Sequence, residues 1–391
     1  MKEYKIAKGW AIFIYITAPL LIALFVWILL MPIIPGMKND LDDSYYWFLA
    51  LISIAMIALM VIGILDTIKG KFIIDKNKIY TTGVFSTRAL FFHEIKGYRI
   101  ADKFIFIEPI KKDKKVIKVS SYFAKTDEIK EWLIDNYSDL DLTKTIAEKK
   151  AIINNTTFGL TKKEREEKLK QAFKVSTIFN WTGGLIGLWV SFFPKPYEFA
   201  IIGAVLFPIL SIAVLKYFNG LIKFDEYDRT AYPSLFWAIF APSIAIFLRS
   251  IIDFNIFDYS KVWPPTILLS LSCMAVILYR NQEFKDTTLP YVSYLSILLF
   301  MSAYAYGAVV TLNCAFDNSQ PKLFNAKILN KNIHSGKSET YHFELTPWGS
   351  QKEPDEVTVS KDLYNSLEKN DAVTIYFMKG KFEIAWFEIS E

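Results

Sequence analysis

The chain has 391 residues, of which 52% are hydrophobic and 16% are aromatic, including 32 phenylalanines. A soluble globular protein carries fewer apolar residues, so the surplus must face lipid, and the composition excludes an ordinary soluble protein. The 45 basic residues nearly balance the 40 acidic ones, which leaves a net charge of +5. We therefore expect membrane lipids as partners, and no nucleic acid.

About seven apolar segments are long enough to cross a bilayer. The first, residues 9–31, carries no charge and is much longer than the apolar region of a signal peptide, so we expect it to remain as an anchor. With the second, residues 46–68, it makes a transmembrane hairpin over residues 1–68. Five more, residues 175–193, 199–215, 233–252, 262–279 and 289–312, make a helical bundle over residues 175–313.

Basic residues concentrate on one side of these segments. The chain start and alternate loops hold Lys2, Lys5, Lys8, Lys216, Lys223, Arg229, Arg280 and Lys285. Because short loops rich in Lys and Arg stay in the cytoplasm, we expect the N-terminus inside and the C-terminus outside. The interpretation is a multi-pass protein of the bacterial cytoplasmic (inner) membrane.

Residues 69–141 have the character of a soluble β-rich domain. Short β-type runs at 72–75, 78–82, 89–92, 104–108 and 115–119 are separated by turn residues, as in antiparallel hairpins. Residues 126–137 then predict one helix, which Thr126 can cap and which carries Ile129, Trp132 and Leu133 on one face. The pattern predicts a strand meander closed by an amphipathic helix.

The order of these strands, the segment His93-Glu-Ile-Lys-Gly-Tyr98 and the terminal helix with Trp132 together resemble the bacterial pleckstrin-homology-like (PH-like) domain. In that family the domain often follows a transmembrane hairpin. The resemblance covers residues 69–141 only. It implies a membrane-proximal binding or assembly module without catalytic activity, and it names no ligand.

A polar linker with one charged helix is expected over residues 142–174. Thr161 and Glu164 form a capping-box pattern at the start of that helix. Glu164 with Lys168, and Glu166 with Lys170, have the i,i+4 spacing that stabilises exposed helices. We expect the helix to lead directly into the third apolar segment.

The last part, residues 320–391, predicts an extracytoplasmic β-domain. Strand-like runs occupy 323–329, 339–345, 356–359, 372–377 and 382–387, with a short helix at 361–367. Five strands with a helix after the third are the order of a small OB- or SH3-like barrel. The fold class is thus an α-helical polytopic membrane protein with two small β-rich soluble domains.

Two groups of residues are candidate binding sites. The lysines at a predicted hairpin tip of the PH-like domain could contact anionic lipid headgroups, and the alternative is a solvated loop. Aromatic residues of the last domain could form a binding face, and the alternative is that they make its core. The lysines are Lys111, Lys112, Lys114, Lys115 and Lys118, and the aromatic residues are Tyr341, Trp348, Tyr376 and Trp386.

Signs of chemistry are missing from the sequence. The common hydrolase, metalloprotease and nucleotide-binding motifs do not occur, and His93, His334 and His342 lack the neighbours of a metal site, so we expect no cofactor and no metal. Asp66 and Arg249 lie toward segment ends, and the middles of the apolar segments hold nothing more polar than Ser, Thr, Tyr and Asn. Transporters usually place ionisable side chains at depth.

The leading hypothesis is therefore a non-enzymatic adaptor that binds lipid headgroups or protein partners through its two soluble domains. Those partners would be membrane or envelope proteins, including a second copy of the chain. One alternative is a transporter or channel made by the last five segments, prompted by their Pro and Gly interruptions. The other is a membrane enzyme of lipid or envelope metabolism.

Overall fold

A computed structural model describes residues 1–31, 43–225, 229–279, 281, 283, 290–335 and 339–390. The chain divides into two compact units, Met1–Ala147 and Glu148–Glu391. Arg280 and Lys285, which contributed to the expected orientation, lie outside the described residues.

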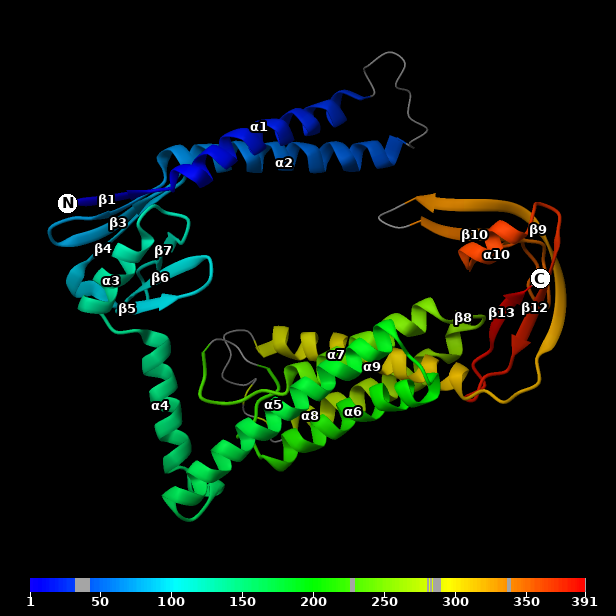
Figure 1. The fold of residues 1–391 in the computed structure, drawn as a ribbon. Helices are drawn as coiled ribbons and strands as arrows, with labels where there is room; N and C mark the ends of the chain where they lie inside the picture. The colour runs from blue at the N-terminus through cyan, green and yellow to red at the C-terminus, as the bar shows by residue number, and fades with distance from the viewer. Residues whose placement is uncertain are drawn as a thin grey trace. The chain divides into compact units, whose positions relative to one another are not determined.

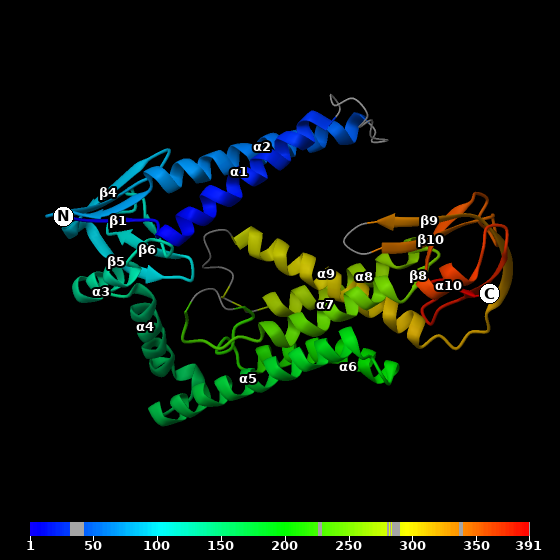
Figure 2. The same cartoon turned by 45° about the horizontal axis from the view of Figure 1, so that its top comes forward.

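The first unit begins with a helical hairpin. Helices α1 (Lys8–Leu30) and α2 (Asp43–Lys69) lie side by side in two views (Figures 1 and 2). The stretches Lys8–Leu30 and Tyr46–Lys69 are long and apolar enough to cross a membrane. Large apolar side chains such as Phe13, Trp27 and Leu51 are exposed on them. A helix with apolar residues on all sides is stable in lipid and unstable in water, so the hairpin belongs in a bilayer.

Seven short strands and one helix form the β-rich domain, where the sequence predicted five strands and one helix. One antiparallel sheet has the order β1-β2-β3-β4, and the other has the order β5-β6-β7. Helix α3 (Thr126–Asn136) buries Ile129 and Leu133 in the core that the two sheets share. The strands are β1 (Lys2–Lys5), β2 (Lys71–Ile74), β3 (Lys78–Thr82), β4 (Thr87–Phe91), β5 (Ile95–Ile100), β6 (Phe104–Pro109) and β7 (Ile117–Ser120).

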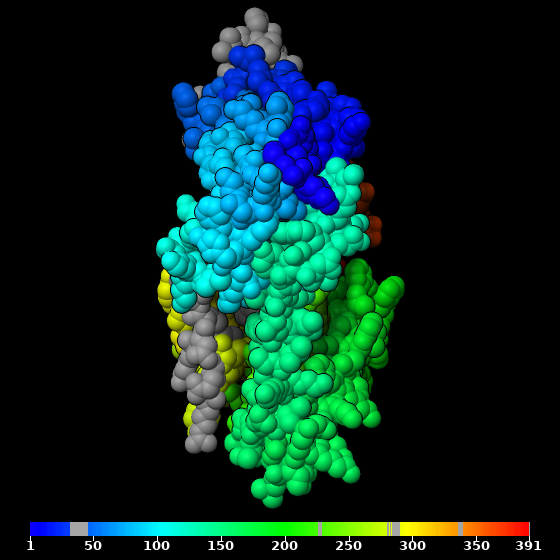
Figure 3. Space-filling view, turned by 90° about the vertical axis from the view of Figure 1, so that its left-hand side faces the viewer, coloured from blue at the N-terminus to red at the C-terminus, as the bar shows by residue number. Residues whose placement is uncertain are grey.

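The first strand was not anticipated, since Lys2 and Lys5 were interpreted as charges flanking the membrane. In β1 these residues pair with β2, with Tyr4 opposite Phe72. Tyr4 is buried in the domain core. Figure 3 shows the dark-blue chain start lying against the lighter blue strands. The transmembrane hairpin is therefore the connection between two neighbouring strands of one sheet.

The polar segment after this domain forms two helices, one more than expected. Helix α4 (Leu140–Asn154) starts where Arg99 of β5 donates to Asp141 (Nη1···Oδ1 2.6 Å) and to Glu108 of β6 (Nε···Oε1 2.6 Å). Helix α5 (Lys162–Phe192) starts with the expected capping box, in which Thr161 and Glu164 each accept the other's backbone N–H. Glu164 serves this cap, and Glu166 pairs with Lys162 (3.9 Å) rather than following the expected spacing to Lys170.

Five helices pack into a bundle in the second unit. Besides α5 they are α6 (Tyr197–Tyr217), α7 (Phe236–Ile252), α8 (Trp263–Leu278) and α9 (Pro290–Ala315). Helix α6, residues Tyr259–Leu278 and helix α9 are long and apolar enough to span a membrane, so the described residues hold five such helices with those of the hairpin. The other two expected spans are helical: α7 is a shorter apolar helix of 17 residues, and residues 175–192 form the second half of α5.

Small residues bring α5, α7 and α9 into close contact. A Cβ added at Gly183 would lie 2.6 Å from the Cα of Ala238, and one at Gly187 would lie 2.9 Å from the Cβ of Ala241. On the other side of α7, a Cβ at Gly307 of α9 would lie 2.7 Å from the backbone nitrogen of Phe247. In lipid, helices associate by packing of this kind, because apolar contact with a neighbour is no better than apolar contact with a lipid tail.

The C-terminal strands form one curved sheet with the order β11-β10-β9-β12-β13-β8. The long strand β9 bends through it (Figure 1) and pairs with β12 in its first half and β10 in its second. The strand at one edge of the sheet, β8, comes from the connection between α7 and α8, so the bundle contributes to this sheet. The elements are β8 (Asn255–Ile256), β9 (Lys322–Ser335), β10 (Glu339–Leu345), β11 (Asp355–Val359), helix α10 (Lys361–Ser366), β12 (Ala372–Met378) and β13 (Trp386–Ser390).

Two adjacent glycines of α5 allow a matched test of the helix packing. We expect Gly183→Ala to lower the free energy of unfolding by about 2 kcal/mol, because the new methyl group would meet the backbone of α7. Gly184 has no atom within 4 Å of the same position. Gly184→Ala should leave stability unchanged or raise it by up to about 1 kcal/mol. Unfolding of the full chain in mild detergent would measure both, and equal effects would contradict the packing described.

Candidate functional site

The expected lysine group lies on the β6–β7 hairpin. Lys111, Lys112, Lys115 and Lys118 are exposed, whereas Lys114 is half-buried and pairs with Glu94 (Nζ···Oε1 2.5 Å). The ammonium of Lys118 lies 5.4 Å from the ring centre of Phe106. One of the five lysines is thus engaged in an ion pair, and four present charge to solvent.

Lys111, Lys112, Lys114 and Lys115 lie past the end of β6 that is far from the start of the membrane hairpin, and Lys118 pairs with Phe106 partway along β6. The other end of β6 is next to that start, since Ser121 donates its backbone N–H to Lys103 (3.0 Å) and Ala7 donates to the carbonyl of Tyr122 (2.9 Å). At about 3.3 Å per residue, about 20 Å of strand separates Lys103 from the lysine hairpin. The sequence could not show this, because the contact joins residues more than a hundred positions apart.

A second exposed group, which we call the hairpin base, lies where the domain meets the two helices. It comprises Lys8, Trp10, Lys69, Lys103 and Tyr122. The rings of Trp10 and Tyr122 are in contact, with centres 4.5 Å apart and planes tilted by 54°. Tryptophan and tyrosine favour the headgroup level of a bilayer, and exposed lysines there attract anionic lipids. Lys103 and Tyr122 were missed from the sequence, although Trp10 at the start of an apolar segment is a visible signal.

An ion-pair group holds the first strand beside the hairpin base. Glu3 of β1 accepts from Lys71 of β2 (2.9 Å) and from Lys5 (3.2 Å). Hydrogen bonds from Lys71 and then Lys5 lower the pKa of the Glu3 carboxyl. The contact adds side-chain pairing to the backbone pairing of β1 with β2.

The expected aromatic binding face of the last domain does not form. Trp348 is 4% exposed and Trp386 is 6% exposed, and both pack in hydrophobic cores. Tyr341 and Tyr376 are half-buried, and Tyr341 packs against Tyr364 of α10. The prediction of an exposed face was wrong for both tryptophans, because Trp348 lies in the core of the curved sheet and Trp386 packs against the end of α9 and the connection before α8.

The end of α9 forms a tight junction with the β-domain, which we call the α9 junction. Its residues are Asn313, Asp317, Gly380, Phe382, Ile384 and Trp386. The side chain of buried Asn313 donates to the carbonyl of Ile384 (2.8 Å) and accepts the N–H of Phe382 (2.8 Å). Gly380 has a φ of +81°, and an added Cβ would collide with the carbonyl of Ile384. The amide therefore fixes a turn that only glycine can make there.

Asp317 holds the same junction from the other side. Its Oδ2 accepts the indole N–H of Trp386 (2.9 Å) and the backbone N–H of Gly380 (2.7 Å). Burial alone would raise the pKa of Asp317, but hydrogen bonds from Ser319, Trp386 and Gly380 outweigh it and lower this pKa. The carboxylate thus joins the end of α9 to β13.

A cavity of about 470 Å³ lies beside this junction, lined by Lys195, Tyr197, Arg249, Asp253 and Trp386 among others. Two of its charged groups, Arg249 and Asp253, bind each other, and Lys195 is exposed. Arg249 donates to the carbonyls of Val190 (2.8 Å) and Ser191 (2.7 Å) and to Asp253 (3.1 Å), and Tyr197 donates to Asp253 (2.8 Å). The arrangement fastens α5 to α7.

Metal-binding clusters are absent from the described residues: no group of three or more His, Cys, Asp or Glu side chains could hold an ion. His334 and His342 stack with ring centres 4.4 Å apart on neighbouring strands, and Glu356 lies 3.4 Å from His334. Cys273 and Cys314 are free and buried.

No family model, curated protein or solved structure matches the chain.

The α9 junction can be tested by removing one amide. We expect Asn313→Leu to speed amide hydrogen exchange at residues 380–384, since both hydrogen bonds of the side chain are lost there. Asn330→Leu, at an exposed asparagine of β9, is the matched control and should leave exchange at 380–384 unchanged. Unchanged protection in the Asn313 variant would contradict the junction.

The Glu3 ion pairs predict a dependence on pH. A lowered pKa means that Glu3 stabilises the fold above its unfolded pKa and that this contribution disappears as the pH falls through the folded pKa. We expect Glu3→Gln to melt below the wild type above about pH 5, with the difference shrinking in more acidic buffer. Thermal melts of both proteins across pH would measure it, and a difference independent of pH would refute the role of the carboxylate.

Proposed function

We propose that the chain is a non-enzymatic adaptor of the bacterial cytoplasmic membrane. In this proposal a PH-like module on the cytoplasmic side contacts lipid headgroups and partners, and an OB-type module outside binds partners there. A second copy of the chain is one such partner. The membrane helices hold both modules in a fixed orientation.

The topology of the two modules supports this interpretation. The first has four and three antiparallel strands in two sheets closed by one helix, which is compatible with a PH-like domain. In the second, β9 to β13 lie in the order third, second, first, fourth, fifth, with α10 after the third, as in a partly open OB-type barrel. By analogy between folds, a PH-like and an OB-type module would favour binding over catalysis.

The observation that carries the proposal is that each module is joined to membrane helices at two places. The first joins them through β1 before α1 and through β2 after α2. The second joins them through β9 after α9 and through β8, which pairs with β13. Two connections restrict rotation far more than one flexible linker does, and an adaptor needs its surfaces held in this way.

The inside of the bundle favours an adaptor over a transporter. Three of its buried hydroxyl groups donate to carbonyls of their own helix: Ser211 to Phe207, Ser243 to Ile239, and Thr311 to Gly307. Buried Tyr304 donates to the carbonyl of Val205 on α6, and Ser270 of α8 shares a hydrogen bond with Ser302 of α9. Such groups have used their donor, so they offer little to an ion or a polar substrate. A transport pathway for an ion or a polar substrate would need polar side chains in the middle of the membrane.

The hairpin base is the stronger candidate for headgroup contact in the first module. Its lysines and the Trp10–Tyr122 pair adjoin the membrane helices directly. The exposed lysines of the β6–β7 hairpin are farther along β6 and suit an acidic segment of a partner. Both assignments follow from charge and position.

The proposed orientation can be tested with single new cysteines. Both natural cysteines are buried, so background labelling should be low. We expect an impermeant maleimide to label Phe382→Cys in intact cells and Phe85→Cys only after lysis, since both sites are exposed but belong to different modules. If only Phe85→Cys were labelled in intact cells, the first module would lie outside, and the proposed orientation would be wrong.

The adaptor function can be tested by crosslinking in cells. A photo-crosslinking amino acid at exposed Leu323 should yield a defined adduct, and the same residue at buried Ile328 of the same strand is the control. We expect Asn313→Leu to weaken the Leu323 adduct, because the module would lose its fixed orientation. Absence of any adduct from Leu323 and from Phe85 would contradict the proposal.

A further inference from the structure

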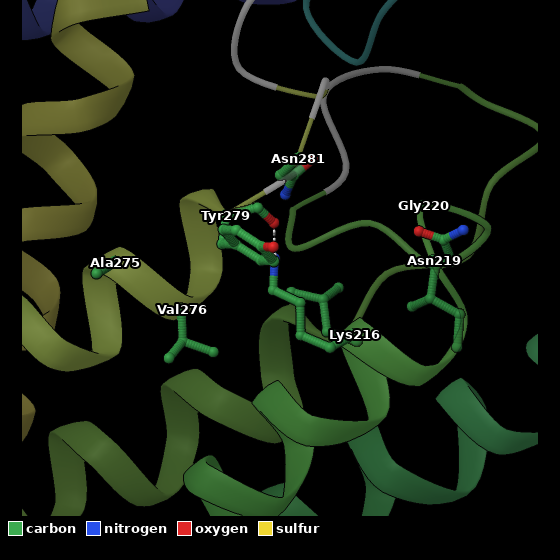
Figure 4. Close-up of a pocket in the computed structure, with 9 residues that line it drawn as sticks. Lys216, Asn219, Gly220, Ala275, Val276, Tyr279 and Asn281 are labelled. Atoms are coloured by element: carbon green, nitrogen blue, oxygen red, sulfur yellow. Dashed lines mark hydrogen bonds between the residues drawn. The ribbon is translucent and has the colours of Figure 1, made fainter.

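A cavity of about 490 Å³ opens between the last turns of α6 and α8, at the end of the bundle away from the β-domain (Figure 4). Part of its lining is apolar and comes from Leu215, Ile222, Ala275 and Val276. The rest is polar and comes from Lys216, Asn219 and Asn281, together with the backbone of the turn at Gly220. Apolar and polar walls in one cavity suit an amphipathic ligand.

Lys216 is the only ammonium that lines this cavity among the described residues. It donates to the carbonyls of Ile277 (2.8 Å) and Tyr279 (2.7 Å), just past the end of α8, as the dashed line in Figure 4 indicates for Tyr279. An ammonium has three donors, so one remains. The helix end offsets only about half of the charge. Lys216 is therefore held in place with positive charge to spare.

Two amides also line the cavity. Asn281 accepts the backbone N–H of Glu283 (2.9 Å) through its oxygen, which leaves its NH₂ group as a donor. Asn219, on the turn after α6, has an exposed side chain. A fixed ammonium and two amide donors in the lining of one cavity match the several acceptor oxygens of a phosphate group.

Glu283 is the carboxylate closest in sequence to the cavity. It accepts the backbone N–H groups of Phe224 (2.9 Å) and Asp225 (3.1 Å), one with each oxygen. Burial raises the pKa of this carboxyl, and its charge also acts on Lys216. Glu283 fixes the chain after α6 and does not line the cavity.

The neighbouring side chains mark the level of the cavity in a bilayer. Tyr217 and Tyr279, at the ends of α6 and α8, are 75% and 63% exposed. Exposed tyrosines at the ends of membrane helices lie at the headgroup level. The polar part of the cavity is then beside the headgroups, and its apolar part continues toward the acyl chains.

We propose that this cavity binds one phosphate-bearing anionic phospholipid, with its phosphate on Lys216, Asn219 and Asn281 and its glycerol and first acyl carbons against Ala275 and Val276. The site belongs to the bundle and is separate from both soluble modules. Basic pockets between membrane helices hold anionic headgroups by the same combination of charge and shape.

The test is native mass spectrometry of the full chain in mild detergent, titrated with phosphatidylglycerol or with phosphatidylcholine of the same acyl chains. We expect phosphatidylglycerol to bind more tightly, and Lys216→Met to weaken it about fivefold, the factor for one lysine at a lipid surface. Lys223→Met is the matched control: it removes a charge from the same end of the bundle, where Lys223 lies over the ring of Tyr232 (4.5 Å). It should change binding less than twofold.

Lys216→Met could lower stability, because that lysine also caps α8, so a second variant tests the site without changing the lysine. Ala275→Trp keeps the lysine and fills the apolar wall, and we expect it to abolish tight binding of phosphatidylglycerol. Three outcomes would overturn the proposal: equal binding of the two lipids, equal losses in the Lys216 and Lys223 variants, or unchanged binding in Ala275→Trp. Displacement by excess inorganic phosphate would show a site for free phosphate and not for a lipid.

Discussion

The backbone pairing of β1 with β2 is the constraint on which the first unit depends. These strands are neighbours in one sheet, yet the chain between them crosses to the far end of α1 and returns along α2. Tyr4 belongs to the same buried core as Phe72, so the domain cannot complete its core without the residues that precede the membrane. Folding of the domain and formation of the hairpin are thereby coupled.

The second unit reaches a similar result by a different route. A two-residue strand from the α7–α8 connection extends the C-terminal sheet, and Asn313 and Asp317 at the end of α9 bind the turn before β13. These contacts replace water at buried backbone groups, which would otherwise be costly to leave unpaired. A module held in this way transmits its position to the helices, which is useful for assembly and unnecessary for a tethered binding domain.

Some local signals in the sequence predicted the structure correctly, whereas the expected pairing of Glu166 with Lys170 does not form and the non-local contacts were not predicted. The capping box of Thr161 and Glu164 lies within four residues, so its pattern was sufficient. Strand β1 has four residues and one buried side chain, and β8 has two residues, so neither shows a periodicity. Strand β5 was overlooked because Lys96 and Gly97 interrupt its apolar pattern, and Gly97 is needed there since a Cβ would meet the carbonyl of Ser138 at 2.5 Å.

The candidate sites likewise depend on contacts between residues that are distant in the sequence. Composition could mark Lys216 as a basic residue after a span, but its position beside Asn281 depends on the packing of α6 against α8. Aromatic residues such as Trp348 have the same sequence pattern on a surface and in a core, and only the curvature of the sheet decides between them. The exposed lysines Lys111 and Lys112 were found from sequence, whereas their distance from the hairpin base required the pairing of β6 with β7.

The most direct test of the central claim measures a distance within the first unit. Spin labels at exposed Leu20 of α1 and exposed Phe85 of the β3–β4 turn would report how firmly the domain is held on its hairpin. We expect one narrow distance distribution by pulsed EPR in lipid nanodiscs, and a broad one after deletion of residues 2–5. A broad distribution in the full chain, or a narrow one that survives the deletion, would contradict attachment through β1.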